Sequence, residues 1–167
     1  RTVATIQGLN HGDAVKVVNT RLYHGWHRGS TATDDRRAWE LVRTELRAYV
    51  TKVISYLPDI EFGNNLSCGG VRLPLFDTLR TLEGGGESQK MVDTSLTVDL
   101  LHFARTSSRS LRKGAPPSSL AIVVGDDDDL IPGVFAAESW GMTVVVLRVK
   151  RERPNRHLQT NGLIFQI

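Results

Sequence analysis

Residues 120–147, LAIVVGDDDDLIPGVFAAESWGMTVVVL, decide the predicted fold. Both ends of this stretch, residues 120–124 and 142–147, are uncharged apolar runs typical of strands buried on both faces of a parallel sheet. Between them, Pro132 suits the first turn of a helix and Gly141 suits its end. The pattern predicts a β-α-β unit with parallel strands and a right-handed crossover. We therefore expect an α/β protein with a doubly wound open sheet and helices on both faces.

Further elements are predicted on either side of this unit. Residues 14–23 contain several valines and predict a strand, and residues 163–167 predict a last strand. Thr33 suits the N-cap of a helix over residues 34–50. Residues 92–105 carry an apolar stripe at helical spacing, and residues 73–79 fit either a short strand or a turn.

Composition limits the class of protein. A chain of 167 residues fits a single domain, and 40% hydrophobic with 23% charged residues excludes disorder over the whole chain. No apolar run is long enough to span a membrane, so no membrane partner is expected. The single cysteine excludes an internal disulfide and favours a reducing, cytoplasmic setting. Arginine outnumbers lysine and the net charge is +3, which leans toward a nucleic-acid partner.

The four consecutive aspartates at residues 126–129 are the main candidate site. They follow a predicted buried strand and precede a predicted helix, where ligands bind in open α/β sheets. Adjacent carboxylates repel one another, and a hard cation such as Mg²⁺ or Mn²⁺ relieves that repulsion. The alternative is that one aspartate caps the following helix and the others are solvated.

A second acidic element lies in residues 90–99, KMVDTSLTVD. Asp93 suits the start of the predicted helix, and a capping role alone would explain it. Asp99 interrupts an apolar stretch, where a carboxylate needs a partner or a metal. The two aspartates are six residues apart, roughly 120° around a regular helix, so they share a face only if Asp93 sits in the turn that enters it.

Together the two acidic elements resemble the NYN family of PIN-like ribonucleases. The resemblance covers residues 89–148, and the residues that carry it are Lys90, Asp93, Leu96, Asp99, Asp127, Asp129, Leu130, Pro132, Gly141, Val144 and Val146. It implies an α/β fold, namely a three-layer α/β/α PIN-like (Rossmannoid) domain with a central, mostly parallel sheet. It also implies an RNA substrate and one or two Mg²⁺ or Mn²⁺ ions that polarise the scissile phosphate and activate a water.

The resemblance assigns roles to the aspartates. Asp93, Asp127 and Asp129 would bind the metal, and Asp126 remains a candidate ligand because the register within the run is open by one residue. Asp99 would be a further ligand, or would position water or a ligand from outside the coordination sphere.

The family's first-strand aspartate has no counterpart in this chain. Either Gln7 stands in its place, or the first strand lies upstream of Arg1. We therefore expect a single domain over residues 1–167 that lacks its first strand or belongs to a longer protein with further domains. The leading hypothesis is a metal-dependent ribonuclease, and the alternative is a degenerate domain that binds RNA or a partner protein without turnover. A phosphatase is less favoured, since no nucleophilic aspartate follows a first strand.

Basic and aromatic residues supply candidate RNA contacts. Flanking the metal site, two basic patches could hold the RNA backbone that carboxylates repel, and Trp26 or Tyr23 could stack on a base. The first patch consists of Arg105, Arg109, Arg112 and Lys113. A second patch consists of Lys150, Arg151, Arg153 and Arg156. The alternatives are ordinary surface solvation of both patches and, for residues 23–27, a strand end with a polar turn.

Overall fold

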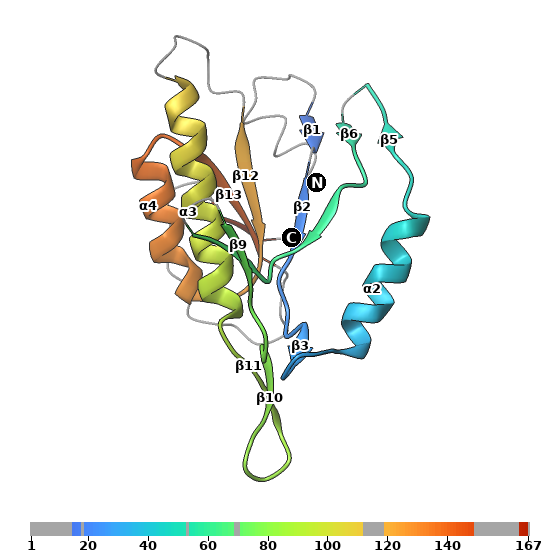
Figure 1. The fold of residues 1–167 in the computed structure, drawn as a ribbon. Helices are drawn as coiled ribbons and strands as arrows, with labels where there is room; N and C mark the ends of the chain where they lie inside the picture. Colours follow the sequence, from blue (N-terminus) through green and yellow to red (C-terminus); the bar gives the residue numbers. More distant parts are fainter. Residues whose placement is uncertain are drawn as a thin grey trace. The chain divides into compact units, whose positions relative to one another are not determined.

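The chain divides into two compact units. The computed structural model describes residues 15–17, 19–52, 54–68, 71–111, 119–148 and 164–166. The boundary falls inside helix α3 (Val92–Leu111), so that the N-terminal unit reaches Leu96 and the C-terminal unit continues from Thr97. Figure 1 shows the elements of both units.

A parallel three-stranded sheet forms the centre of the C-terminal unit. It contains β12 (Leu120–Val124), β13 (Thr143–Arg148) and β14 (Ile164–Gln166), with β13 in the middle. The β12–β13 register runs from Leu120 opposite Thr143 to Val124 opposite Leu147. Helix α4 (Ile131–Ser139) connects these two strands. The predicted β-α-β unit with parallel strands is confirmed, and so is the last strand.

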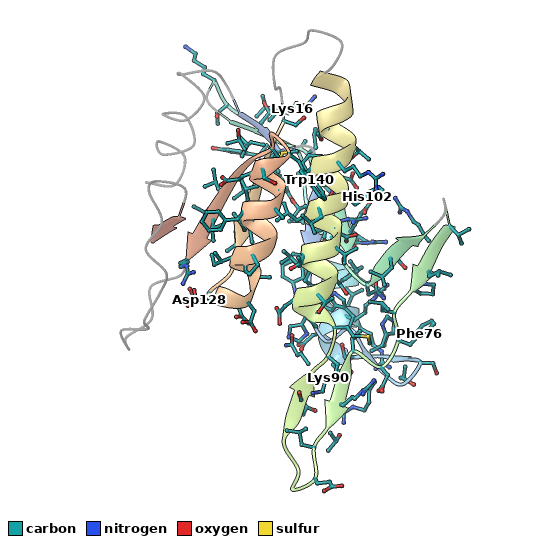
Figure 2. All side chains as sticks on the ribbon, turned by 90° about the vertical axis from the view of Figure 1, so that its left-hand side faces the viewer. Lys16, Phe76, Lys90, His102, Asp128 and Trp140 are labelled. Carbon is teal, nitrogen blue, oxygen red and sulfur yellow. The ribbon has the colours of Figure 1, made fainter. Side chains whose placement is uncertain are left out.

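Helices α3 and α4 pack closely against each other in this unit, as Figures 1 and 2 both show. A Cβ atom added to Gly133 of α4 would lie 2.6 Å from Cγ2 of Thr97 on α3. Leu100 and Ala104 of α3 are buried, as the apolar stripe predicts, whereas Phe103 is exposed. The absence of a side chain at Gly133 therefore sets the distance between the two helices.

The N-terminal unit is built from short strands. β1 (Val15–Val17) and β2 (Thr20–Leu22) run parallel to β6 (Ile54–Tyr56) and β7 (Ile60–Phe62), respectively. The strand predicted over residues 14–23 is thus found as two short pieces. The other strands pair antiparallel: β3 (His27–Arg28) with β4 (Thr31–Ala32), β5 (Tyr49–Val50) with β6, β8 (Asn65–Cys68) with β9 (Val71–Pro74), and β10 (Leu79–Thr81) with β11 (Glu87–Gln89).

Helix α2 (Asp34–Glu45) begins where the sequence predicts. Thr33 is its N-cap, and the Oγ1 atom of Thr33 accepts a hydrogen bond from the N–H of Arg36. The helix ends five residues before the predicted end, because Tyr49 and Val50 are in strand β5. None of the residues of α2 is buried, so its apolar side chains, including Leu41 and Val42, face solvent.

The predicted fold class is wrong. The described strands form six sheets of two or three strands each, many of them antiparallel, and no large central parallel sheet is present among them. A doubly wound three-layer sheet, PIN-like or otherwise, needs a succession of buried strands and covering helices. The continuous apolar runs that make such strands occur at β12 and β13, whereas the N-terminal strands are short and their one described helix, α2, buries nothing. Among the described residues, no helix combines the length and apolar character needed to cross a membrane.

Candidate functional site

The aspartate loop (Asp126–Asp129) lies at the carboxyl end of β12. Gly125 leads into it, and the N–H of Gly125 donates to the carbonyl oxygen of Leu147 at 3.1 Å. The loop continues into a single 3-10 turn, Asp128–Leu130, and then into α4. Because parallel strands end at the same edge of a sheet, the loop stands beside the end of β13. Figure 2 shows Asp128 at the end of α4 where that helix begins.

Asp127 shapes the loop from within. Its Oδ1 atom accepts a hydrogen bond from the N–H of Asp129 at 2.9 Å, which makes Asp127 the N-cap of the 3-10 turn. The side chains of Asp127 and Asp129 are both exposed, and that of Asp126 is half-buried. Negative charge is favourable here, since the loop precedes the N-terminus of α4. The alternative that an aspartate caps the following helix is therefore wrong for α4, whose N-cap is Leu130 without a side-chain hydrogen bond, because Asp127 caps the 3-10 turn that precedes it.

Asp128 makes the contact that sequence reasoning missed. Its Oδ1 atom forms an ion pair with Nη2 of Arg148, the last residue of β13. The Arg148 side chain is 4% exposed and the Asp128 side chain 37% exposed. One signal in the sequence could have indicated this pair: Arg148 directly follows the apolar run of β13. In the parallel register the last residue of β12 is opposite Leu147, so Arg148 lies beside the start of the loop. A buried charge at that edge needs a partner, and the aspartate loop is the nearest source of one.

The other predicted ligands, Asp93 and Asp99, both lie on helix α3. Asp99 is half-buried on α3, roughly 100° around the helix from the buried Leu100. Asp93 lies in the first turn of α3 and belongs to the N-terminal unit, whereas the loop belongs to the C-terminal unit. Within the described residues, no group of three or more His, Cys, Asp or Glu side chains is arranged to hold a metal ion.

The described part of the predicted basic patch lies away from the aspartate loop. Arg105 is exposed and lies eight residues beyond Thr97, about 12 Å along the axis of α3. Thr97 contacts Gly133 near the start of α4, and the two helices run in the same direction. Figure 2 accordingly shows Asp128 and Trp140 at opposite ends of α4, with His102 of α3 at about the height of Trp140. The side chain of Arg109 and residues Arg112 and Lys113 lie outside the described residues, as do Gln7 and the patch at residues 150–156.

Trp26 is part of the core of the N-terminal unit. Its side chain is 2% exposed, its indole N–H donates to the carbonyl oxygen of Leu22 at 2.9 Å, and its ring meets Phe62 edge-on at 4.9 Å. In this conformation the indole is not presented to an RNA base. The alternative interpretation of residues 23–27, a strand end with a polar turn, fits this arrangement better.

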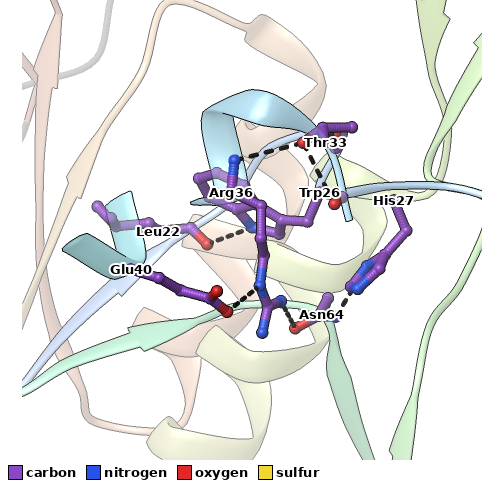
Figure 3. A network of polar contacts seen from close by, with 8 residues as sticks. Leu22, Trp26, His27, Thr33, Arg36, Glu40 and Asn64 are labelled. Atoms are coloured by element: carbon purple, nitrogen blue, oxygen red, sulfur yellow. Dashed lines mark hydrogen bonds and ion pairs between the residues drawn. The ribbon is translucent and has the colours of Figure 1, made fainter. Parts of the chain in front are cut away.

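His27 belongs to a buried polar network in the same unit, drawn in Figure 3. The Nδ1 atom of His27 lies 3.3 Å from Nδ2 of Asn64, whose Oδ1 atom accepts a hydrogen bond from Nη1 of Arg36. Arg36 also stacks on the Phe62 ring and pairs with Glu40. Burial lowers the pKa of His27 and the Arg36 charge lowers it further, while Glu40 opposes the shift. This network holds α2 against β7.

Comparison with known proteins assigns no family to the chain: no protein-family model matches it, and no curated protein or solved structure is significantly similar to it. The resemblance to the NYN family therefore remains a hypothesis based on the motifs alone.

Proposed function

We propose that this chain binds a divalent cation, Mg²⁺ or Mn²⁺, at the aspartate loop and uses it to cleave RNA phosphodiester bonds. The observation that carries the proposal is the pair of exposed carboxylates, Asp127 and Asp129, in a loop held at the carboxyl edge of a parallel sheet. That edge is where open α/β sheets bind their ligands.

The donor set fits a cation that is only partly coordinated by protein. Mg²⁺ usually keeps several waters and binds to one or two carboxylates together with substrate phosphates. Asp127 and Asp129 supply two such carboxylates, and only one of the two Asp127 oxygens, Oδ1, accepts the hydrogen bond from the N–H of Asp129. A bound cation would polarise the scissile phosphate and activate a water for attack.

Two further features support RNA as the ligand. The excess of arginine over lysine and the net charge of +3 favour a phosphate-bearing partner. In addition, Arg148 neutralises one of the four loop charges through its ion pair with Asp128. That neutralisation reduces the repulsion that a polyanion would meet at the loop.

The test combines cation binding with cleavage. Calorimetric titration with Mn²⁺ and cleavage of a fluorescent RNA, with and without a chelator, are measured for the chain and for Asp127→Asn and Asp129→Asn. Asparagine at position 127 keeps an oxygen that can cap the turn, so the fold is retained. We expect each variant to weaken Mn²⁺ binding by roughly tenfold or more and to abolish cleavage.

The matched control is Asp35→Asn, which removes an exposed aspartate from the first turn of α2. It should leave both Mn²⁺ binding and cleavage unchanged. RNA binding without turnover, insensitive to Asp127→Asn, would instead identify a binding domain. Absence of Mn²⁺ binding by the unaltered chain would refute the proposed cation site.

A further inference from the structure

Arg148 is an unusual residue to find in the interior of the C-terminal unit. It ends β13, the middle strand of the three-stranded sheet, and is 3% exposed. Burying a guanidinium is costly unless a counter-charge and hydrogen bonds compensate for the lost water. Asp128 provides the counter-charge and is itself more than one third exposed. The ion pair thus joins a buried, strand-anchored cation to a loop that faces solvent.

Three of the contacts made by the loop bear on its geometry. The N–H of Gly125 bonds to Leu147, Asp127 caps the turn, and Asp128 pairs with Arg148. The first two contacts involve the backbone of the loop. The third is made by the Arg148 side chain of the neighbouring strand β13. It holds Asp128, the residue between Asp127 and Asp129.

We infer that Arg148 is a positioning residue for the cation-binding loop. By holding Asp128 from the sheet side, it fixes the turn in which the flanking carboxylates of Asp127 and Asp129 point to solvent. This inference rests on the function proposed above. It assigns Arg148 no contact with the cation or with RNA.

The direction in which cation affinity changes when Arg148 is replaced distinguishes a positioning role from a purely electrostatic one. A positive charge beside the loop repels a divalent cation, so removing the charge of Arg148 would by Coulomb's law tighten cation binding. If Arg148 acts by positioning the loop, removing it weakens binding, because partners outside the coordination sphere that orient ligands typically contribute roughly 10-fold to 100-fold in affinity.

The experiment measures Mn²⁺ affinity by calorimetry for the full chain and its variants, each verified as folded by circular dichroism. Arg148→Met removes the charge and keeps the length of the buried side chain, and Arg148→Lys keeps the charge. Val145→Ala, at a fully buried position of the same strand, controls for loss of stability. Amide hydrogen exchange of residues 125–130 reports on the loop directly.

We expect Arg148→Met to weaken Mn²⁺ binding roughly tenfold or more and to speed exchange of the loop amides, with Val145→Ala binding as the unaltered chain does. Arg148→Lys should recover most of the affinity. Unchanged or tighter binding by Arg148→Met would overturn the inference, and so would an equal loss in Val145→Ala. Absence of binding by the unaltered chain is a separate result that overturns the proposed function.

If Arg148→Met does not fold, Asp128→Glu supplies the same test. It keeps both charges of the ion pair and lengthens the acidic side chain by one methylene, so a change in affinity reports geometry. We expect weaker Mn²⁺ binding in Asp128→Glu, and an affinity equal to that of the unaltered chain would overturn the inference.

Discussion

The close approach of α3 and α4 gives the sharpest prediction about stability. In Gly133→Ala, the new methyl group would lie 2.6 Å from Cγ2 of Thr97 and 3.5 Å from its Cβ and Oγ1 atoms. The first distance is far inside van der Waals contact, whereas the other two are ordinary contacts. The clash therefore depends on a single methyl group of Thr97.

Two opposing effects determine the size of the change. Overpacking a helix contact costs about 1–3 kcal/mol. Replacing glycine by alanine inside a helix stabilises by about 1 kcal/mol. We expect Gly133→Ala to lower the free energy of unfolding by about 1 kcal/mol in the unaltered chain. In a Thr97→Ala background the clash is gone, and the same substitution should raise stability by up to about 1 kcal/mol.

The assay is a double-mutant cycle of four proteins, with unfolding followed by urea denaturation and circular dichroism. The expected coupling energy between positions 97 and 133 is about 2 kcal/mol, well above the error of such a cycle. If Gly133→Ala stabilises the unaltered chain, or if the two substitutions are additive, the contact between α3 and α4 is not as close as described.

Two predictions concern the N-terminal unit. The pKa of His27 is lowered in the folded chain, so below the ordinary value of 6.5 the unfolded chain binds more protons than the folded chain does. The free energy of unfolding that depends on neutral His27 is therefore fully present above that pH and decreases below it. His27→Gln should therefore flatten the dependence of the unfolding free energy on pH between about pH 7 and pH 5. Urea denaturation across that range measures this dependence. An unchanged slope in the variant would exclude His27 as its cause. Thr33→Ala removes the N-cap of α2 and should cost about 1 kcal/mol, whereas Thr33→Ser should not; equal stability of both variants in urea would show that the cap contributes nothing.

The C-terminal part of the fold follows from local pattern. The apolar runs at residues 120–124 and 142–147 predict strands, and Pro132 and Gly141 mark the ends of the helix between them. The predicted burial on both faces fits β13, but in β12 only Val123 is buried and Val124 is 60% exposed. Thr33 likewise predicts the start of α2. These elements could be predicted because each is determined within a few residues of sequence.

The N-terminal architecture could not be predicted this way. Valine-rich residues 14–23 indicate a strand but do not indicate that it is split into β1 and β2. The sequence of residues 34–50 also does not show where the helix stops. Its last residues, Tyr49 and Val50, pair with β6 and do not extend the helix. Distant partners, β6 and β7, decided the first outcome, whereas the second depends on a local pairing of Tyr49 with Tyr56 and Val50 with Ser55.

For the candidate site, sequence predicts the place but not the contacts. The position of Asp126–Asp129 directly after a strand is recovered, although only Val123 of that strand is buried, and the aspartate cap is found on the 3-10 turn and not on the predicted helix. The pairing of Asp128 with Arg148 depends on the parallel register between two strands, which composition does not reveal. Trp26 looks like a surface aromatic in sequence because its neighbours are polar, yet Phe62 and the carbonyl group of Leu22 enclose it.

The exposed helix α2 has a consequence for the order of folding. A helix of 12 residues that buries none of them is marginal by itself in water. It is attached in part by Arg36, whose guanidinium lies 4.1 Å from the centre of the Phe62 ring and bonds to Asn64, and the guanidinium of Arg43 lies 5.7 Å from the same ring centre. Phe62 is in β7, which is aligned by pairing with β2, 40 residues earlier in the chain. We therefore expect stable α2 to form only after that long-range strand pairing, which would make the helix late in folding.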